Sequence, residues 1–199
     1  MSINLIGLGY KKQSGKNTVA EILSLIDSGQ IVKDGLYIEG LELIYPDSSL
    51  EIHSFAENLK KICSILQPTA LSQWEHSDFK ESPSEIMPDI TNRKLLQLVG
   101  DGLRKIIHPD IWIASLFKDY TSDSRWIITD VRMKNEADYI KKLGGMVVRV
   151  YRPGISDDSH ISEHDLDDYK FDYTIDNTGS YTELVSKCFD FYDKYLKWK

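Results

Sequence analysis

Short apolar runs alternate with amphipathic stretches, first at the start of the chain and again in its second half. Residues 3–9 are mostly apolar and end in glycine, and apolar side chains then recur at helical spacing over residues 18–26. Residues 126–130 begin a second such pattern, in which helical spacing follows over residues 135–143 and stops at Gly144 and Gly145. This alternation predicts strands joined by helices.

The same alternation continues toward the carboxyl end. Residues 146–150 have the pattern of a buried strand, and residues 173–176 that of a further strand. A turn over residues 177–179 then leads into a last helix, residues 181–196, with Ser180 as its cap. Strands that alternate with helices predict an α/β fold in which a mostly parallel sheet of about five strands is covered on both faces.

The middle of the chain has a different pattern. Helical spacing covers residues 55–66, 92–107 and 111–120, and one short candidate strand, residues 50–54, precedes them. Residues 67–90 contain three prolines and predict a loop with broken helical turns, and residues 31–47 predict an irregular hairpin. We therefore expect a single domain over residues 1–199 in which residues 55–120 form a helical insertion that covers a substrate.

Composition narrows the class of protein. The chain has 199 residues, of which 41% are hydrophobic, a content that suits one sizeable core. A net charge of -7 argues against a chain whose main task is to hold polymeric nucleic acid or an anionic membrane. Neither a signal peptide nor a membrane-spanning run is visible, so we expect a soluble, cytoplasmic protein. Cys63 and Cys188 have no metal-binding spacing and are predicted to be buried free thiols.

The segment from Gly9 to Thr18 lies between the first predicted strand and the first predicted helix. A glycine-bearing loop that enters a helix offers backbone N–H groups and the positive end of the helix dipole to a phosphate chain. A lysine at the end of the loop adds a mobile charge for the β- and γ-phosphates. The predicted ATP-binding residues of this loop are Gly9, Lys12, Gln13, Ser14, Gly15, Lys16, Asn17 and Thr18. The alternative is a chance glycine turn before a surface helix, with lysines that serve solubility.

Two departures from the usual phosphate-loop motif concern the metal and the loop backbone. The first glycine is Gly9, one residue early, with Tyr10 in the usual place, and Asn17 replaces the Ser or Thr expected after the lysine. An Asn carbonyl is a weaker ligand for a hard cation than a carboxylate is. We therefore predict that Mg²⁺ is held by Asn17 and Asp130, mainly through water.

Several separate stretches of the chain carry a family resemblance. The stretches are residues 14–20, residues 54–56 with Leu59 and Lys60, residues 93–100 with Arg104, residues 129–132 with residues 135–137, residues 152–154, residues 162–164 and residues 176–179. In this order they resemble the deoxynucleoside monophosphate kinases of bacteriophages, a branch of the P-loop nucleotide kinases.

The resemblance implies a P-loop kinase fold of three layers, α/β/α, and transfer of a phosphoryl group from ATP-Mg²⁺ to the 5′-phosphate of a deoxynucleoside monophosphate. If the chain is phage-encoded, it would act in the host cytoplasm. Family members often carry Gly-Lys-Asp-Thr in the loop, so Asn17 is a departure that bears on metal handling and rate.

Phosphoryl transfer is catalysed by alignment and by cations, which directs attention to the arginines. Lys16, Asp130, Arg132 and Arg152 are the predicted catalytic residues. Arg93 and Arg104 lie eleven positions apart on one predicted helix, face the same way and are predicted to grip the acceptor phosphate. The alternative for this pair is two surface salt bridges, and the alternative for Asp130 is an N-cap of the helix after it.

Other residues complete the predicted site. Asn177 and Gly179 resemble the turn that cradles adenine in related kinases, although a plain turn is the alternative. The predicted acceptor-side residues are Phe55, Lys60, Arg93, Arg104, Trp112, Arg132 and Glu163. Phe55 and Trp112 would stack on a base, unless they belong to the core. Residues 152–168 form a candidate lid, in which Glu163 and His164 reach the site; a solvated loop is the alternative.

Two other functions stay open on the sequence alone. A P-loop kinase could act on another small phosphorylated acceptor, such as an isoprenoid or coenzyme A precursor, or the chain could bind nucleotides and have lost catalysis. The accepted bases, the choice between ribose and deoxyribose, and homodimer formation are also open.

Overall fold

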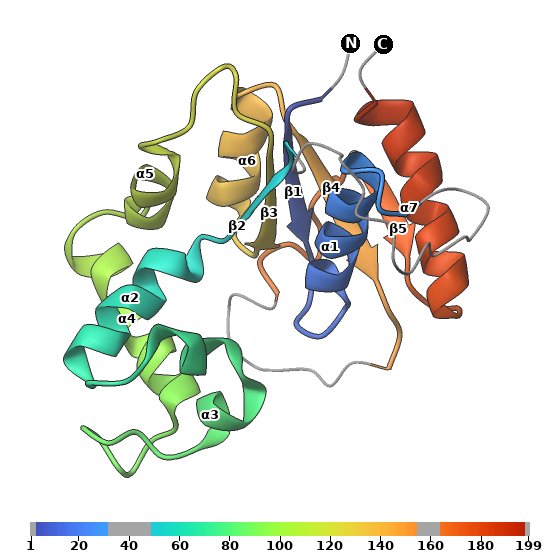
Figure 1. Ribbon diagram of the computed structural model, residues 1–199. Helices are drawn as coiled ribbons and strands as arrows, with labels where there is room; N and C mark the ends of the chain where they lie inside the picture. Colours follow the sequence, from blue (N-terminus) through green and yellow to red (C-terminus); the bar gives the residue numbers. More distant parts are fainter. Residues whose placement is uncertain (1–2, 32–48, 155–163, 198–199) are drawn as a thin grey trace. The chain divides into compact units, whose positions relative to one another are not determined.

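The computed structural model describes residues 3–31, 49–154 and 164–197 (Figure 1). The chain divides into two compact units. The first, an α/β unit, consists of Met1–Ser54 and Thr121–Lys199, and the second, a helical unit, is Phe55–Tyr120. The bounds of the helical unit coincide with residues 55–120, and that these residues cover a substrate stays a prediction. Apart from Ile31, the hairpin predicted over residues 31–47 lies outside the described residues.

The α/β unit is built on a sheet of five strands that all run parallel. The strands are β1 (Leu5–Gly9), β2 (Glu51–His53), β3 (Trp126–Val131), β4 (Met146–Tyr151) and β5 (Tyr173–Asp176), in the order β2-β3-β1-β4-β5. Strand β1 is buried at every position because it pairs with β3 on one side and β4 on the other. The predicted parallel sheet is therefore confirmed.

Helices cover both faces of the sheet, as expected for a parallel sheet. Helices α1 (Lys16–Asp27) and α7 (Tyr181–Tyr195) share a core with β1, in which Ile6 and Leu8 point toward them. Helix α6 (Lys134–Lys142) contacts β1 and β4 from the opposite side, where its Ile140 lies within reach of Gly7. The three layers are thus α1 with α7, the sheet, and α6, in agreement with the predicted fold class.

The helix boundaries agree closely with the sequence pattern. Ser180 caps α7, since its hydroxyl oxygen accepts from the Glu183 backbone N–H at 3.3 Å, as predicted.

Cys188 is buried in α7, and burial raises the pKa of its thiol to about 12. In the helical unit Cys63 is buried too, and burial raises its pKa to about 11. Both cysteines are free thiols, as expected.

The helical unit has its own small core. Its elements are α2 (Ala56–Leu66), the 3-10 turn Leu71–Glu75, α3 (Ser77–Glu81), α4 (Asn92–Ile106) and α5 (Ile111–Phe117). Trp74 is fully buried beside Cys63 and Leu95, and its indole N–H donates to Thr69 Oγ1 at 2.9 Å. Between α2 and α4 the chain forms short helical turns, as the prolines of residues 67–90 indicate.

A buried polar network in the helical unit holds the segment before α4. The Gln67 Nε2 donates to Asn92 Oδ1 at 2.9 Å, and the Ser84 hydroxyl donates to Gln67 Oε1 at 2.7 Å. All three side chains are almost fully buried, so each lost hydrogen bond would leave a buried polar group unsatisfied. The network thereby ties Asn92, the first residue of α4, to the segment before the helix, and the Thr91 hydroxyl caps the helix by accepting from the Lys94 backbone N–H at 3.2 Å.

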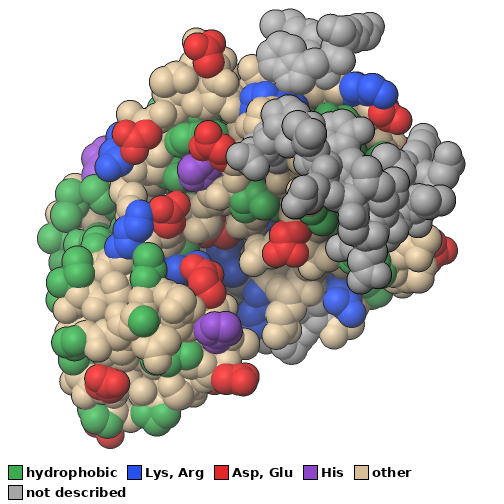
Figure 2. Space-filling view, viewed as in Figure 1, with side chains coloured by type: hydrophobic (Ala, Val, Ile, Leu, Met, Phe, Trp, Pro, Cys, Tyr) green, Lys and Arg blue, Asp and Glu red, His purple; other side chains and the backbone are tan. Residues whose placement is uncertain are grey.

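The exposed surface mixes charges of both signs. On the face shown in Figure 2, acidic and basic side chains are interspersed, and hydrophobic side chains gather over the helical unit. The exposed apolar residues of the helical unit include Ile65 and Leu66 of α2, and Ile106 and Ile107 at the end of α4. Among the helices of the described ranges, none is long and apolar enough to cross a membrane. Whether the chain forms a homodimer stays open, as it was on the sequence.

A buried ion pair joins three elements at the amino-terminal edge of the sheet. Asp27 at the end of α1 accepts from Arg125 Nη1 at 2.9 Å and from the Tyr192 hydroxyl of α7 at 2.8 Å. The two charged side chains are only 5% and 6% exposed. Burial alone would raise the pKa of Asp27, but the bonds from Tyr192 and the Arg125 guanidinium hold it below its ordinary value of 3.8.

We expect Asp27→Asn to lower the free energy of unfolding by about 3–5 kcal/mol, because it leaves the Arg125 charge buried without its carboxylate. The stabilisation from Asp27 is present above its unfolded pKa and is lost as the pH falls through its lower folded pKa. Urea unfolding at pH 7 and in acid measures both effects. Asp119→Asn, in an exposed pair with Lys118, is the control and should change stability by less than about 0.5 kcal/mol. Equal effects of the two changes would contradict this account.

Candidate active site

The carboxyl ends of all five parallel strands lie at the same edge of the sheet. The chain leaves β1 there toward β2 and leaves β3 there toward β4, which lie on opposite sides of β1. Open α/β sheets bind their ligands at such a switch point. The loop after β1, Asp130 near the end of β3, Arg152 after β4 and Asn177 after β5 all come from this edge.

The loop from Gly9 to Lys16 encloses the lysine amino group. The Lys16 Nζ donates to the Tyr10 carbonyl at 3.1 Å, to the Lys11 carbonyl at 2.5 Å and to the Ser14 hydroxyl at 3.3 Å. The side chain is 6% exposed. The loop therefore encloses the ammonium group that would meet a bound phosphate.

The charge of Lys16 is influenced by two of the other predicted catalytic residues. The pKa of Lys16 is lowered from 10.5 to about 7: burial is the largest cause, the nearby Arg132 also lowers it, and Asp130 acts in the opposite direction. Lys16, Asp130 and Arg132 are thus brought together from a helix start, a strand end and the segment after that strand. A bound phosphate would favour the charged form of this buried ammonium and raise its pKa again.

Helix α1 begins at Lys16 without a side-chain cap and without an acidic residue in its first turn. Its first backbone N–H groups and the positive end of its dipole are consequently directed at the loop, where an anion would be stabilised. Thr18 is half-buried in this first turn and Asn17 is exposed.

Two residues of the loop that are not glycine adopt positive φ angles, Tyr10 at 98° and Gln13 at 61°. Tyr10 stands at the position where the usual motif has glycine, so the backbone keeps the glycine-type conformation although the side chain is bulky. Such a conformation costs about 1–3 kcal/mol and persists only when its surroundings hold it.

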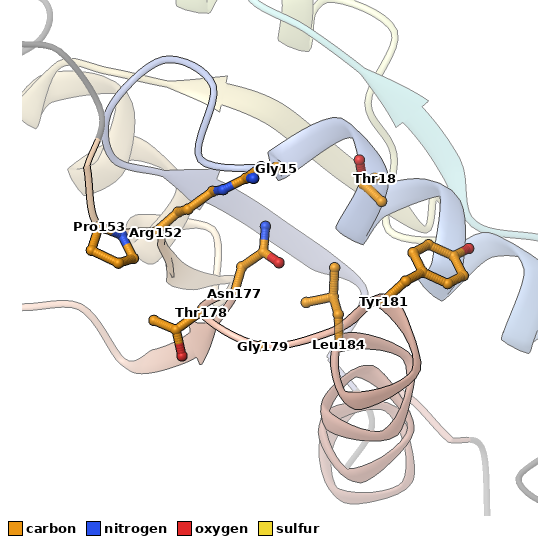
Figure 3. Close-up of a pocket in the computed structure, with 9 residues that line it drawn as sticks. All are labelled: Gly15, Thr18, Arg152, Pro153, Asn177, Thr178, Gly179, Tyr181 and Leu184. Atoms are coloured by element: carbon orange, nitrogen blue, oxygen red, sulfur yellow. The ribbon is translucent and has the colours of Figure 1, made fainter.

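A cavity of about 420 Å³ adjoins the loop on the side of β4 and β5 (Figure 3). Its lining comes from the loop and α1, the end of β4, and the turn into α7, and consists of Gly15, Thr18, Arg152, Pro153, Asn177, Thr178, Gly179, Tyr181 and Leu184. Figure 3 shows the Arg152 and Asn177 side chains directed toward Gly15. The volume is in the usual range for small-molecule sites.

Asn177 joins the turn after β5 to the phosphate loop. Its Nδ2 donates to the Ser14 backbone carbonyl at 2.9 Å, so the side chain is held against the loop where both line the cavity. The predicted adenine-side residues, Asn177 and Gly179, therefore line a cavity next to the loop. Contact with adenine itself stays a prediction.

Asp130 is not the N-cap of α6, so that alternative is wrong. Asp130 belongs to β3, and α6 begins at Lys134 with Met133 at the N-cap. The Glu136 carboxylate takes the capping role, accepting from the backbone N–H groups of Arg132 and Met133 at 2.9 and 3.1 Å. The Asp130 side chain is accordingly not used for capping.

Sequence reasoning missed the capping role of Glu136, although a signal was present. An acidic residue three positions after the N-cap is the usual sign of a reciprocal cap. Glu136 is nearly fully buried and fixes the backbone of Arg132. Tyr181 and Leu184 line the cavity and were not among the predicted site residues. Their position at the start of the last helix, directly after the predicted adenine turn, could have indicated this role.

The predicted acceptor-side arginines lie on one helix, since α4 spans both Arg93 and Arg104. Each already contacts a carboxylate of the helical unit. Arg93 Nε donates to Glu81 at 2.6 Å, and Arg104 Nη1 donates to Asp101 at 3.4 Å. Both carboxylates are about half exposed, so a phosphate could replace them at little cost. Their role in acceptor binding stays a prediction.

The aromatic candidates are packed inside the helical unit. Phe55 contacts Phe117 at a ring-centroid distance of 6.2 Å, and the Trp112 indole N–H donates to the Gly100 carbonyl at 3.1 Å. These contacts favour the core role for both residues. Lys60 Nζ donates to both carboxylate oxygens of Glu75, at 2.8 and 2.7 Å. A role of these three residues toward the acceptor is untested.

The carboxyl-terminal end of the candidate lid is anchored to the α/β unit. Asp165 accepts from the Lys134 backbone N–H at 2.6 Å, Asp168 pairs with the Lys134 amino group at 2.8 Å, and Leu166 is buried. His164 pairs with Asp167 at 3.1 Å. Glu163, with the rest of residues 155–163, lies outside the described residues.

The residues present suit a magnesium ion that keeps most of its waters. No group of three or more His, Cys, Asp or Glu side chains able to hold a metal occurs within residues 3–31, 49–154 and 164–197. Asp130 lies near Lys16, and Asn17 is exposed in the first turn of α1. Mg²⁺ is often bound by one or two carboxylates together with substrate phosphates, and at this edge Asp130 would supply a carboxylate.

The fold and the wrapped lysine loop define the chain as a P-loop kinase. A family model described as deoxynucleotide monophosphate kinase matches residues 46–188. A protein of Acanthamoeba polyphaga mimivirus is 34% identical over 201 residues, covering 92% of this chain and 93% of its own length. The deoxynucleotide monophosphate kinase of Enterobacteria phage T4 is 33% identical over 190 residues, covering 91% of this chain and 71% of its own. The chain belongs to the deoxynucleotide monophosphate kinase family.

A solved structure supports the fold independently. Dephospho-CoA kinase from Campylobacter jejuni superposes with a TM-score of 0.52 at 17% identity, with 96% of each chain covered. At this level of identity the likeness concerns the fold alone. The predicted family and the predicted P-loop kinase fold are confirmed.

We expect Gly15→Ala to weaken ATP binding at least tenfold. Gly15 has φ 96°, and an added Cβ would collide with the Asn177 amide nitrogen, so both the loop and the cavity wall must shift. Calorimetric titration with an ATP analogue measures the effect. Gly102→Ala in α4 is the control, because its Cβ would meet nothing within 4 Å and should leave binding unchanged. A folded Gly15→Ala protein with normal affinity would show that the loop does not hold the nucleotide.

Proposed function

We propose that the chain transfers the γ-phosphoryl group of ATP to the 5′-phosphate of a deoxynucleoside monophosphate and forms the diphosphate. The observation that carries this proposal is the loop that encloses Lys16, with Asp130 and Arg132 close enough to change its pKa. Membership of the deoxynucleotide monophosphate kinase family supports the acceptor class.

The reaction needs alignment and charge neutralisation more than it needs a base. An oxygen of the acceptor phosphate attacks the γ-phosphorus, the bond from this phosphorus to the β,γ-bridging oxygen breaks, and ADP leaves. The attacking oxygen is already largely ionised near neutral pH, so no proton has to be removed from it. Catalysis therefore depends on holding the two phosphates in line and on cations around the moving group.

The side chains of the site divide this task. The loop N–H groups and Lys16 hold the β- and γ-phosphates, and Arg132 adds positive charge beside Lys16. Arg152 lines the cavity next to Gly15 and adds charge on the adenine side of the loop. Bound Mg²⁺ would neutralise phosphate charge, and Asp130 and Asn17 would hold it through water molecules. Arg93 and Arg104 would hold the acceptor phosphate.

A substrate panel tests the proposal. ADP release should occur with at least one deoxynucleoside monophosphate and should be absent with Lys16→Ala, because the neutral side chain no longer stabilises the transferring phosphoryl group. Circular dichroism checks that the variant is folded. Turnover only with a coenzyme A or isoprenoid precursor would assign a different acceptor. ATP binding without turnover of any acceptor would indicate a protein that has lost catalysis.

The acceptor side has a test of its own. We expect Arg93→Met and Arg104→Met each to raise the KM for the acceptor about tenfold or more while the KM for ATP stays within about twofold, as loss of a bidentate phosphate contact predicts. Lys94→Met, a change of an exposed cation on the same helix, is the control and should leave both constants near normal. An unchanged acceptor KM in both arginine variants would return the pair to the role of surface salt bridges.

Asn17 is tested by restoring a carboxylate. We expect Asn17→Asp to increase the rate about tenfold and to lower the Mg²⁺ concentration needed for half-maximal activity, because a carboxylate is the better ligand for a hard cation. Gln13→Glu adds the same charge to an exposed position of the loop and should not reproduce this gain. If both changes act alike, charge alone matters and Asn17 does not face the metal.

A further inference from the structure

Strand β4 places a cation against the strained end of the phosphate loop. Arg149 lies opposite Gly9 in the β1–β4 ladder, one residue before Tyr10. Its guanidinium carbon is 3.8 Å from the centre of the Tyr10 ring and 5.3 Å from that of Tyr151. A guanidinium at this distance over an aromatic ring makes a favourable cation–π contact.

Arg149 has no acidic partner among the residues that the structure describes. Its Nε is buried without a hydrogen-bond acceptor, and its contacts there are with the rings of Tyr10 and Tyr151. Arginine side chains usually form an ion pair with a carboxylate. The Arg149 guanidinium instead stacks on the Tyr10 ring.

Tyr10 is held from further sides as well. The Phe171 ring meets it edge-on at a centroid distance of 6.5 Å, and Tyr151 lies at the same distance with its ring tilted by 40°. At the preceding residue there is no spare room, since a Cβ at Gly9 would lie 3.1 Å from Phe171 and 3.3 Å from Leu166. The chain leaves β1 along a path determined by these side chains.

The held residue is one that positions the catalytic lysine. The carbonyl oxygens of Tyr10 and Lys11 accept from the Lys16 Nζ, so the two peptide units that follow Tyr10 Cα and Lys11 Cα set where the ammonium lies. Tyr10 adopts φ 98°, a conformation that a tyrosine leaves unless its surroundings retain it. Holding the Tyr10 ring in place therefore also holds the carbonyl oxygens that position Lys16.

We infer that the stack of Arg149 on Tyr10 is a positioning device that preorganises the phosphate loop for ATP. Tyr10 and Arg149 are positioning residues: they act through Lys16 and the loop backbone and do not themselves contact the transferred group. In the usual motif a glycine permits this conformation at no steric cost, whereas here a ring clamped by a cation enforces it. The inference rests on the proposed use of the loop as the ATP site.

The test is a double-mutant cycle on the binding of a non-hydrolysable ATP analogue with Mg²⁺, measured by calorimetry on the full chain. We expect Tyr10→Ala and Arg149→Met each to weaken binding about tenfold, and the double variant to be little weaker than either one, because both remove the same stack. Tyr10→Phe keeps the ring and should bind within about threefold of the unchanged protein. Arg149→Lys keeps the charge without the planar group and should recover only part of the loss.

Steady-state kinetics separates positioning from general weakening of the fold. The KM for ATP should rise in Tyr10→Ala and Arg149→Met, while the KM for the acceptor stays within about twofold. Should Tyr10→Ala fail to fold, Arg149→Met decides alone, since it leaves the loop sequence unchanged.

Additive losses in the cycle, or normal affinity in folded Arg149→Met, would overturn the inference. Additivity would mean that Arg149 and Tyr10 affect binding independently of each other. If the unchanged protein bound no ATP analogue, the proposed function would fail at its donor site and the inference with it. If instead the unchanged protein and its variants bound ATP equally well, only the inference would fail and the proposed function would stand.

Discussion

Parallel pairing of β1 with β3 on one side and β4 on the other is the constraint on which the rest of the structure depends. Because the three strands run in the same direction, their carboxyl ends meet at one edge, and the chain must leave β1 and β3 there. The loop around Lys16, the carboxylate of Asp130 and the cation of Arg152 are brought to one place by this pairing. None of them is a neighbour of the others in the chain.

The loop shows how a departure from a motif can be compensated elsewhere. A tyrosine stands where glycine is usual, yet the backbone keeps the conformation that glycine would allow. Strand β4 supplies the compensation, because its register sets Arg149 beside the tyrosine ring. The strain is thus held by sheet geometry, and the lysine that the loop encloses is held with it.

The two units make different contributions to the proposed reaction. The α/β unit carries the loop, the cavity and the predicted metal-side residues, and its network around Asp27 and Arg125 joins α1 to α7 away from the site. The helical unit carries Arg93 and Arg104 on α4, and buried bonds among Gln67, Ser84 and Asn92 hold the first residue of that helix. Donor chemistry and acceptor chemistry are therefore supported by separate cores.

Much of the fold follows from local pattern. Apolar runs and helical spacing place the strands and the main helices to within a few residues. A strand or helix that is buried on one side has apolar residues at regular intervals, so the pattern is visible in the sequence. The lysine loop was also visible, since a glycine-rich turn between a strand and a helix is a local feature. Ser180 as the cap of α7 is local as well.

Contacts between distant segments could not be found in this way. That Asn177 bonds to the Ser14 carbonyl and that Arg149 covers Tyr10 both depend on strand order and register. Phe55 and Trp112 show the same limit, because their helical spacing fits a base-stacking role and a core role equally. The sequence by itself determined the elements and the phosphate loop. The tertiary structure decided which side chains surround that loop, because only packing brings together residues that lie more than a hundred positions apart.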